Sequence, residues 1–308
     1  MKVLVTGGAG FIGSNFVELL EFLEPSYKIV VVDKLTYAGN KHNLDGTVAQ
    51  FVKGDISDYG FMNEVFNEHK FNCIINFAAE THVDRSIDMG YQTTFFNSNI
   101  LGTYCLLKLS KEFGIERYIQ VSTDEVYGDL PRNSTEKFTE DTSLNPHNPY
   151  SVSKASADML CNSYHRTYGL PVIITRCSNN YGPKQNKEKF IPNMIEHAGN
   201  NKSLPVYGDG ENVRDWIHVI DHCRALYAIL KSGKIGEVYN IGGNTELKNI
   251  NVVKMILKLM GKSEDMIEFV EDRLGHDFRY AMDITKIKKE LGWIPTIDFE
   301  EGLEELIR

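Results

Sequence analysis

A tyrosine and a lysine stand four residues apart at Tyr150 and Lys154. The pair stands at the start of the helix predicted over 151–168, and helical spacing places both side chains on one face. A nearby ammonium group stabilises a phenolate, which lowers the tyrosine pKa from about 10 toward a value suited to a general base. On an isolated helix the same spacing is more common in a pair of surface residues. A catalytic interpretation therefore depends on what lies beside it.

Two adjacent carboxylates follow a predicted strand over 117–122. The strand ends at Ser122 and continues directly into Thr123, Asp124 and Glu125. Neighbouring acids repel each other, and such a site can hold one carboxyl protonated and the other ionised. The alternative is a solvated acidic turn. The pattern favours one general acid beside one general base.

A glycine-rich turn opens the chain, with Gly7, Gly10 and Gly13 in the spacing G-x-x-G-x-x-G. It follows a predicted strand over 2–6 and precedes a predicted helix over 11–24. The glycines allow backbone N–H groups to approach a pyrophosphate, and the helix N-terminus favours the negative charge. A structural turn with a helix cap is the alternative. The context favours a dinucleotide-binding turn.

Asp33 ends the second predicted strand, twenty residues after Gly13. A carboxylate at this distance is typical of a residue that accepts from the adenosine ribose hydroxyls. It would also repel a ribose 2′-phosphate, which favours NAD over NADP. The adjacent Lys34 leaves NADP open. Asp55 and Ile56, after the third strand, are expected beside the adenine.

The elements that position these residues alternate in a βαβ pattern typical of a parallel sheet. Predicted strands cover 2–6, 28–33, 50–53, 73–77, 117–122 and 172–176. Predicted helices cover 11–24, 59–69, 96–113 and 151–168. The carboxyl ends of parallel strands meet at one edge of the sheet, where such folds bind ligands. We therefore predict an α/β fold with a Rossmann-type, doubly wound parallel sheet.

A smaller C-terminal α/β substrate-binding lobe is predicted beyond about residue 178. Pro183, Pro192 and Pro205 break the later chain into short elements. Residues 213–229 and 237–241 are expected to add one more helix and strand to the main sheet. The NAD-binding domain is therefore predicted as residues 1–177 plus 213–243. The nucleotide-sugar-binding lobe is predicted as residues 178–212 plus 244–308.

The composition excludes several classes of protein. The 308 residues carry a formal charge of −9 and are 42% hydrophobic. An acidic total argues against a nucleic-acid binder or a protein of anionic membrane surfaces, but it allows a small anionic ligand held by local cations. No apolar stretch is long enough to span a membrane, and no signal peptide is recognisable. The five scattered cysteines lack a C-x-x-C pair, which favours reduced thiols in a cytoplasmic protein.

A metal site is not expected. His218 and His222 have the i, i+4 spacing of a metal pair. The glutamate of H-E-x-x-H is missing between them, and no third ligand is suggested. A structural helix is the better interpretation.

Several segments together resemble a known family. T-G-G-A-G-F-I-G-S at 6–14, Y-x-x-x-K at 150–154 and S-T-x-x-V-Y-G at 122–128 resemble extended short-chain dehydrogenases/reductases that act on nucleotide sugars. This group is the NAD-dependent epimerase/dehydratase superfamily. Residues 33–40, 78–86, 123–125 and 176–183 resemble its nucleotide-sugar 4,6-dehydratases most closely, over nearly the whole chain. Thr-Asp-Glu is the most diagnostic part, because epimerases usually lack the acidic pair.

The resemblance implies NAD as cofactor and a nucleotide sugar, dTDP-glucose, as substrate. It implies that Tyr150, activated by Lys154, takes the proton of the glucose C4 hydroxyl, and that Thr123 hydrogen-bonds the same oxygen. Glu125 would remove the C5 proton, and a protonated Asp124 would assist loss of the C6 hydroxyl. The expected net reaction is loss of water to a 4-keto-6-deoxy sugar, with NAD regenerated. Another nucleotide specificity, a UDP-sugar 4-epimerase and an idle NAD-binding regulatory protein are the alternatives.

The expected cofactor-binding positions combine the glycine turn with residues at the strand ends. They are Gly7, Gly10, Phe11, Ile12, Gly13, Asp33, Lys34, Leu35, Thr36, Asp55, Ile56, Ala78, Ala79, Glu80, Ser98, Tyr150, Lys154 and Asn180.

The expected substrate-binding positions are carried over from the family motifs. They are His82, Thr123, Asn179, Lys189, Phe190, Pro205, Val206, Tyr207, Arg214, Asn249, Arg273 and His276. Arginine and lysine suit a diphosphate, and residues 205–207 suit a base pocket. Leu274 replaces the proline of the usual R-P-G-H-D, so a looser turn without loss of activity is expected. The family further implies a homodimer formed through the helices predicted over 96–113 and 151–168.

Overall fold

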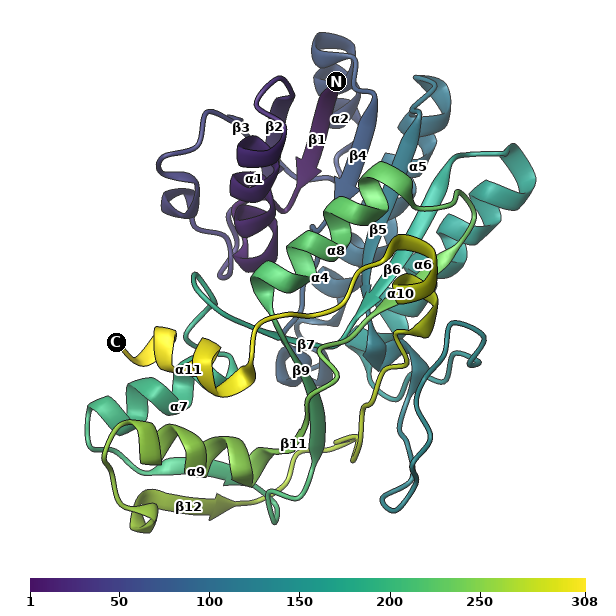
Figure 1. The fold of residues 1–308 in the computed structure, drawn as a ribbon. Helices are drawn as coiled ribbons and strands as arrows, with labels where there is room; N and C mark the ends of the chain where they lie inside the picture. The colour runs from purple at the N-terminus through teal and green to yellow at the C-terminus, as the bar shows by residue number, and fades with distance from the viewer.

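A seven-stranded parallel sheet forms the centre of the protein, which is described over residues 1–308 by a computed structural model (Figure 1). Its strand order is β10-β6-β5-β4-β1-β2-β3, and every neighbouring pair is parallel. The strands are β1 (Lys2–Thr6), β2 (Lys28–Asp33), β3 (Gln50–Lys53), β4 (Cys73–Asn76), β5 (Arg117–Thr123), β6 (Val172–Cys177) and β10 (Val238–Ile241). The order reverses direction between β1 and β4, which is where doubly wound sheets bind ligands. The predicted Rossmann-type fold is confirmed.

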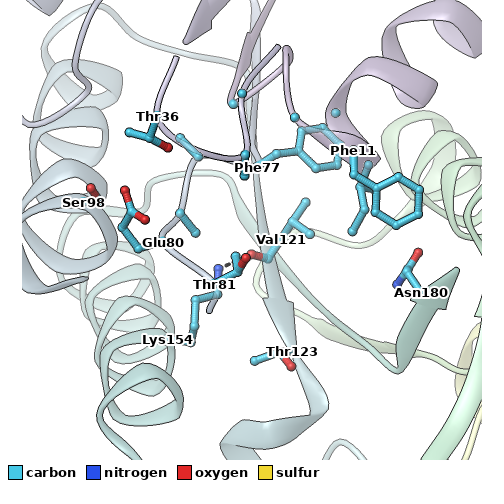
Figure 2. A pocket seen from close by; sticks show the side chains of 18 of the residues that line it. Phe11, Thr36, Phe77, Glu80, Thr81, Ser98, Val121, Thr123, Lys154 and Asn180 are labelled. Carbon is cyan, nitrogen blue, oxygen red and sulfur yellow. Dashed lines mark hydrogen bonds between the residues drawn. The ribbon is translucent and has the colours of Figure 1, made fainter. Parts of the chain in front are cut away.

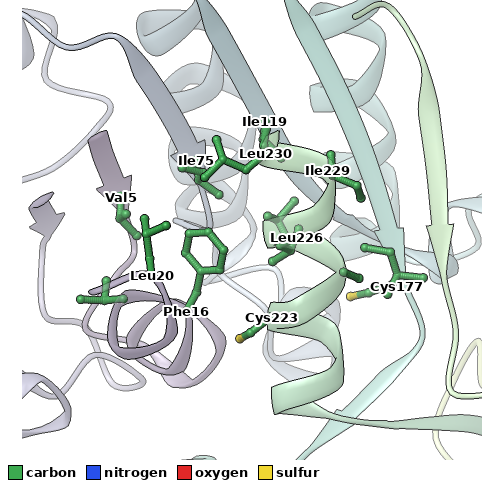
Figure 3. Packing of buried hydrophobic residues seen from close by; sticks show 14 of the residues in the cluster. Val5, Phe16, Leu20, Ile75, Ile119, Cys177, Cys223, Leu226, Ile229 and Leu230 are labelled. Atoms are coloured by element: carbon green, nitrogen blue, oxygen red, sulfur yellow. The ribbon is translucent and has the colours of Figure 1, made fainter. Parts of the chain in front are cut away.

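Helices cover both faces of this sheet, so its strands are buried on both sides. One face packs against α1 (Phe11–Leu23) and α8 (Val219–Ser232) in a cluster of 26 buried residues (Figure 3). The other face packs against α2 (Tyr59–His69), α5 (Gly102–Glu112) and α6 (Pro149–Tyr168). This explains why the strands are apolar runs without alternation.

The smaller lobe contains two short sheets with helices packed around them. One sheet has the order β11-β9-β7, and the other pairs β12 with β8. The strands are β7 (Asn179–Tyr181), β8 (Leu204–Tyr207), β9 (Val213–His218), β11 (Glu246–Lys248) and β12 (Ile267–Val270). The helices are α7 (Phe190–Gly199), α9 (Asn249–Leu259) and α11 (Phe299–Ile307). Trp216, Val253 and Phe299 belong to the separate core that these elements enclose.

Short helices and turns complete the chain. They are η1 (Lys41–Leu44), α3 (Val83–Ile87), α4 (Gln92–Phe95), η2 (Phe96–Leu101), η3 (Asp124–Tyr127), η4 (Glu264–Met266) and α10 (Thr285–Leu291). No helix combines the length and the apolar character that a membrane span needs.

Two predicted helices differ from the observed elements. The helix expected over 213–229 begins only at Val219, because residues 213–218 form strand β9 and pair with β7 and β11 on its two sides. The helix expected over 96–113 starts as the π-helical segment η2 and becomes α5 at Gly102. The residues V-R-D-W-I-H carry no clear alternation, and pairing on both edges decides in favour of a strand.

The C-terminal segment runs back across the molecule before it ends. Helix α10 packs against β10 and α8, and Trp293 joins the core of the main sheet. The Trp293 indole donates to the Asp221 backbone carbonyl at 3.2 Å, and the Asp221 carboxylate accepts from the Thr296 and Ile297 N–H groups at 2.8 Å each. The chain then returns to the lobe as α11 (Figure 1). The predicted division at residues 243 and 244 stays a prediction, and this segment packs across it.

Candidate active site

One cavity opens at the carboxyl edge of the main sheet, at the reversal between β1 and β4 (Figure 2). Every predicted cofactor position except Leu35 lines it. Leu35 contributes through its backbone N–H, which donates to the Asp33 carboxylate at 2.8 Å, and its φ of 56° makes a sharp turn after β2. Residues that are far apart in sequence therefore converge on one space.

The glycine turn leaves no room for side chains. Gly7 has φ +70°, and a Cβ there would lie 2.5 Å from the backbone nitrogen of Ala78. A Cβ on Gly13 would meet the Gly7 carbonyl oxygen and lie 2.8 Å from the Cα of Gly8. Gly10 caps α1 without any side-chain hydrogen bond to the first turn. The turn and the helix N-terminus are thus built for close backbone approach to a pyrophosphate.

Asp33 is fixed at the end of β2. Its two carboxylate oxygens accept from the N–H groups of Ala9 at 3.0 Å and Leu35 at 2.8 Å. Burial nevertheless raises the pKa of Asp33. Each oxygen keeps a further lone pair, so the residue can still accept from a ribose hydroxyl.

Lys34 is engaged by its neighbours. Its ammonium donates to the Ser98 hydroxyl at 2.6 Å and lies 3.6 Å from the Asp55 carboxylate and 3.7 Å from the Glu80 carboxylate. With Asp33 beside it, this end of the cavity holds three carboxylates against one ammonium. The 2′-phosphate of NADP would be repelled by the negative charge here. Of the two cofactors, the site therefore favours NAD over NADP.

The predicted acid, Asp124, lies at the start of η3 and is 2% exposed. Its Oδ1 accepts from the Thr123 hydroxyl at 3.1 Å, and its Oδ2 has no partner in the protein. Burial raises the pKa of Asp124 well above its usual range, and the charges of Glu125 and Asp215 raise it further. Burial and the neighbouring charges therefore favour the protonated form of Asp124, which is the form that can donate a proton.

Glu125 has different surroundings. Burial raises its pKa overall, and the charges of Arg273, Arg214 and Lys189 limit this rise. The Asn148 side-chain amide lies 3.5 Å from its Oε2 as a donor. Within the acidic pair, Glu125 is thus the carboxyl that cations favour as an anion. This agrees with opposite protonation duties for the two acids.

Tyr150 and Lys154 both face the cavity from the first turns of α6. The Lys154 ammonium donates to the Val121 backbone carbonyl at 2.6 Å, shown as a dashed line in Figure 2. Burial, followed by the charge of Glu125, raises the pKa of Tyr150 well above 10. The predicted lowering of this pKa by Lys154 is therefore not what the protein alone produces, because burial and the charge of Glu125 act in the other direction.

The predicted substrate residues Thr123, Asn179 and Lys189 also line the cavity. The Lys189 ammonium donates to the Thr81 carbonyl at 2.9 Å, and burial lowers its pKa. His82 lies at the N-cap of α3, where its Nε2 is 3.6 Å from Glu188. The remaining predicted residues do not line this cavity and belong to the lobe beside it.

The two predicted arginines differ in how their donors are used. The Arg214 guanidinium donates to the backbone carbonyls of Val213, Phe278 and Asp277 at 2.8 to 3.2 Å. In Arg273, by contrast, the buried Nε has no partner, and Nη1 lies 3.7 Å from Asp84. Arg273 is therefore the better placed of the two to bind a phosphate, and Arg214 is largely committed to the fold.

His276 follows Arg273 in the same loop. Its Nδ1 lies 2.6 Å from the Asp272 carboxylate. Burial, with the charges of Arg273 and Arg214, lowers the pKa of His276 to about 4, so the ring is neutral at pH 7. Leu274, expected to loosen this turn, is 77% exposed and is followed by Gly275 with φ 63°.

The proposed base pocket is only partly consistent with the structure. Val206 is 1% exposed and lies in the core of the lobe, and the Phe190 ring stacks on Trp216 at 6.1 Å. The Val206 side chain therefore has a packing role, which corrects its predicted contact with a ligand. Tyr207 is exposed, with its ring 6.2 Å from that of His276. Pro205 and Asn249 are half-buried in the same lobe.

Sequence reasoning missed several residues of the cavity wall. They are Val32, Ala38, Gly39, Gly54, Phe77, Thr81, Val121, Ser122, Cys177, Ser178, Gln185 and Asn186. Buried oxygens of Ser122, Ser178 and Gln185 have no partner in the protein, so they are available to a ligand. Ser122 and Ser178 directly precede predicted site residues at strand ends, and that position was the signal available in the sequence.

His222 belongs to a hydrogen-bonded pair at the edge of the cavity. Its Nδ1 lies 2.9 Å from Oδ1 of Asn180, whose Nδ2 donates to the Ser178 carbonyl at 3.0 Å. That second bond orients the amide, so Nδ1 of His222 carries the hydrogen. His218 caps α8 instead. No group of three histidine, cysteine, aspartate or glutamate side chains is arranged to hold a metal ion.

Comparison with known proteins agrees with this geometry. A family model described as GDP-mannose 4,6 dehydratase matches residues 4–306. The chain belongs to this family. It is 52% identical to the low-salt glycan biosynthesis protein Agl12 of Haloferax volcanii, with 100% of this chain and 97% of the relative covered. The resemblance to the epimerase/dehydratase superfamily is confirmed.

Solved structures of the family have the same fold. A dTDP-glucose 4,6-dehydratase from Bacillus anthracis in complex with NAD is 49% identical, with a TM-score of 0.92 and coverage of 100% of this chain and 95% of the other. The dTDP-glucose 4,6-dehydratase DesIV from Streptomyces venezuelae, also with NAD bound, is 44% identical, with a TM-score of 0.95 and coverage of 100% and 96%.

Proposed function

We propose that this protein is an NAD-dependent dTDP-glucose 4,6-dehydratase, a hydro-lyase of deoxysugar biosynthesis. It converts dTDP-glucose into dTDP-4-dehydro-6-deoxy-glucose and water. The observation that carries this proposal is the triplet Thr123, Asp124 and Glu125 beside Tyr150 on one cavity wall. The relatives named as dTDP-glucose 4,6-dehydratases, at 44% to 49% identity over the full chain, support it.

The cavity fits NAD in its chemistry. Gly7 and Gly13 keep side chains away from the turn, Asp33 can accept from the ribose hydroxyls, and Lys34 is paired with Asp55 and Glu80. Bound NAD supplies the hydride acceptor at C4 and the hydride donor at C6, and its oxidised ring brings positive charge. That charge is what Tyr150 requires to lose its proton in this buried site.

Each proton of the reaction has a residue in this chain. Tyr150 takes the C4 hydroxyl proton, and the Thr123 hydroxyl hydrogen-bonds the same oxygen. Glu125 takes the C5 proton, which the 4-ketone makes acidic. Asp124, held protonated, gives its proton to the departing C6 hydroxyl, which leaves as water. Glu125 then returns a proton to C5 as hydride reaches C6, so its proton cancels. The proton that Asp124 gives up with the water is matched by the proton that Tyr150 took from the C4 hydroxyl, and the net change is the loss of one water.

A UDP-sugar 4-epimerase is the alternative within the superfamily. Epimerisation at C4 requires the tyrosine and the hydride but no acid for a leaving hydroxyl. Asp124 is 2% exposed with an unpartnered Oδ2, an arrangement that costs stability and has no use in epimerisation. The acidic pair therefore favours dehydration.

An idle NAD-binding protein would need none of Tyr150, Lys154, Asp124 and Glu125.

Incubation with dTDP-glucose and UDP-glucose side by side in deuterated buffer tests the function. A 4-keto-6-deoxy product from dTDP-glucose, with solvent deuterium at C5, is expected. Formation of the galactose nucleotide without loss of water would contradict the proposal. Asp124→Asn keeps the shape of the site and removes the acid. This variant should still exchange the C5 hydrogen with solvent but eliminate water more slowly.

We further propose a homodimer through η2, α5 and α6. These helices leave Phe96, Leu101, Tyr104, Val152 and Met159 between 40% and 56% exposed. Apolar exposure of this extent on neighbouring helices is typical of a protein interface. Sedimentation of the wild type against Leu101→Glu/Met159→Glu tests this assembly, and a monomeric wild type would contradict it.

The five cysteines are all free and buried, which supports a reducing, cytoplasmic location.

A further inference from the structure

Asn148 lies between the two halves of the catalytic machinery. It is the N-cap of α6, the helix that carries Tyr150 and Lys154. Its Oδ1 accepts from the Ser151 N–H at 2.9 Å, and its own N–H donates to the Ser151 hydroxyl at 3.1 Å. Its Nδ2 lies 3.5 Å from Oε2 of Glu125. The residue is 5% exposed, so water does not compete for these groups.

The helix cap determines which amide atom faces Glu125. A backbone N–H can be accepted only by oxygen, so Oδ1 of Asn148 must point to Ser151. The amide nitrogen is then forced toward the carboxylate of Glu125. An N–H donor in this position favours the carboxylate as an anion.

The backbone around Asn148 has little freedom to move away. The Asn145 N–H donates to the Val126 carbonyl at 3.0 Å, which ties the segment before α6 to η3. Nδ1 of His147 lies 2.6 Å from the buried Asp277 carboxylate. A Cβ on Gly128, whose φ is 86°, would collide with the Asn145 carbonyl oxygen. Glu125 and Asn148 are therefore held against each other from both sides.

From these contacts we propose that Asn148 is a positioning residue for the general base, donating to Glu125 while it caps the catalytic helix. The inference rests on the proposed function, because it assigns the role of base to Glu125. One side chain thereby couples the start of α6 to the acid–base pair on η3. Any shift of the helix start would move the donor as well as Tyr150.

Other charged groups also face Glu125, so the donor is one contribution among several. Arg214 approaches from β9, Arg273 from the loop before His276, and Lys189 from the start of α7, and all three favour the anion. The acidic groups nearby are Asp124 on η3, Tyr150 on α6 and Tyr280 in the C-terminal segment. Because none of these groups is altered by a change at Asn148, a shift in the pH profile reports on the donor itself.

Two substitutions separate the cap from the donor. Asn148→Ser keeps an oxygen for the Ser151 N–H, since serine is as good an N-cap as asparagine, but it cannot donate to Glu125. Asn148→Asp also keeps the cap and places a second carboxylate beside Glu125. Ser151→Ala serves as the matched control, because it removes the reciprocal bond of the cap and leaves Asn148 in place.

We expect unchanged Tm and unchanged NAD content in Asn148→Ser, with kcat for dTDP-glucose lowered about tenfold to hundredfold at pH 7. The low-pH limb of kcat should move to higher pH, because the carboxylate has lost a donor. Asn148→Asp should move it further, so that its activity recovers as pH rises. Ser151→Ala should lower Tm and leave this limb where it is.

A pH profile of Asn148→Ser that superimposes on the wild type would overturn the inference. So would a loss of kcat that follows Tm equally in all three variants, since a structural cap alone would produce it. Turnover of dTDP-glucose by the wild type distinguishes a failure of the proposed function from a failure of the role of Asn148. If the wild type does not dehydrate dTDP-glucose, the proposed function has failed, whereas wild-type turnover with an unshifted Asn148→Ser profile refutes only the role of Asn148.

Discussion

The two sides of the cavity are built in different ways. On the cofactor side, the main sheet supplies a continuous rim of strand ends, and a glycine turn presents its backbone. On the lobe side, separate segments contribute single side chains, and many of their polar atoms are already bonded within the protein. Arg214 gives its donors to three carbonyls, whereas Arg273 keeps one free. A ligand is thus bound by backbone groups and strand ends on one side and by individual side chains on the other.

The largest effect is expected where the two sides meet, at Tyr150. Tyr150→Phe removes only the phenolic oxygen, so kcat should fall about 10²–10⁴-fold, which is typical for loss of a general base. NAD affinity and Tm should stay near the wild-type values. Tyr168→Phe, at the exposed end of the same helix, is the control and should be silent. Unchanged turnover in Tyr150→Phe would remove the proposed base.

Architecture on the cofactor side should make it intolerant of added atoms. Gly13→Ala pushes a methyl group against the Gly7 carbonyl and the Gly8 Cα. We expect a loss of about 1–3 kcal/mol of unfolding free energy together with weaker NAD binding, measured by urea unfolding and NAD titration. Gly60→Ala, in the first turn of α2 with no close contact, should retain both properties. Equal behaviour of the two variants would contradict this account of the turn.

Asp215, in β9 beside the acidic pair, should make stability depend on pH. Burial raises its pKa from 3.8 to about 7, so between these values the native state holds a proton that the unfolded state has lost. Stability from this group therefore falls as pH rises from about 4 to 7. Asp215→Asn cannot ionise, and relative to the wild type it should gain about 3 kcal/mol between pH 5 and pH 8. Parallel urea-unfolding curves at both pH values would show that Asp215 does not titrate in this way.

The smallest effect is expected within the lobe, from single contacts. Arg273→Gln should raise KM for dTDP-glucose about tenfold with Tm unchanged, because its free donor serves the ligand. Arg214→Gln should instead lower Tm, since it leaves buried carbonyls without donors. Steady-state kinetics and thermal unfolding of the two variants measure both outcomes. If Arg214→Gln raised KM without loss of Tm, the contrast between these arginines would be reversed.

The same contrast explains what could be predicted from the sequence. The glycine turn, Asp33 and the Tyr150–Lys154 pair all belong to βαβ units of one parallel sheet, which brings the carboxyl ends of its strands to one edge. Residue spacing alone therefore located that side of the cavity. The lobe offered no such rule, because whether Val206 faces a ligand or the core depends on the pairing of β8 with β12.

The pKa shifts of the site residues were the second feature that could not be predicted from the sequence. The type and spacing of Tyr150 and Lys154 predicted a lowered tyrosine pKa, but the depth of burial and the position of Glu125 decide the direction. Neither quantity can be obtained from spacing. The opposite duties proposed for Asp124 and Glu125 follow from the sequence, whereas the cations that favour an anion at Glu125 come from distant segments.

The returning C-terminal segment has a consequence for how the chain acquires its structure during synthesis. Strand β10 completes the main sheet only after residue 241 has been made, and Ile287 and Trp293 close its core later still. A nascent chain that lacks these residues exposes apolar surface between α8 and the sheet, which favours aggregation. Truncation after Gly243 should therefore give an insoluble product instead of an isolated nucleotide-binding domain. The C-terminal residues thus complete the core of the domain whose first strand lies at the N-terminus.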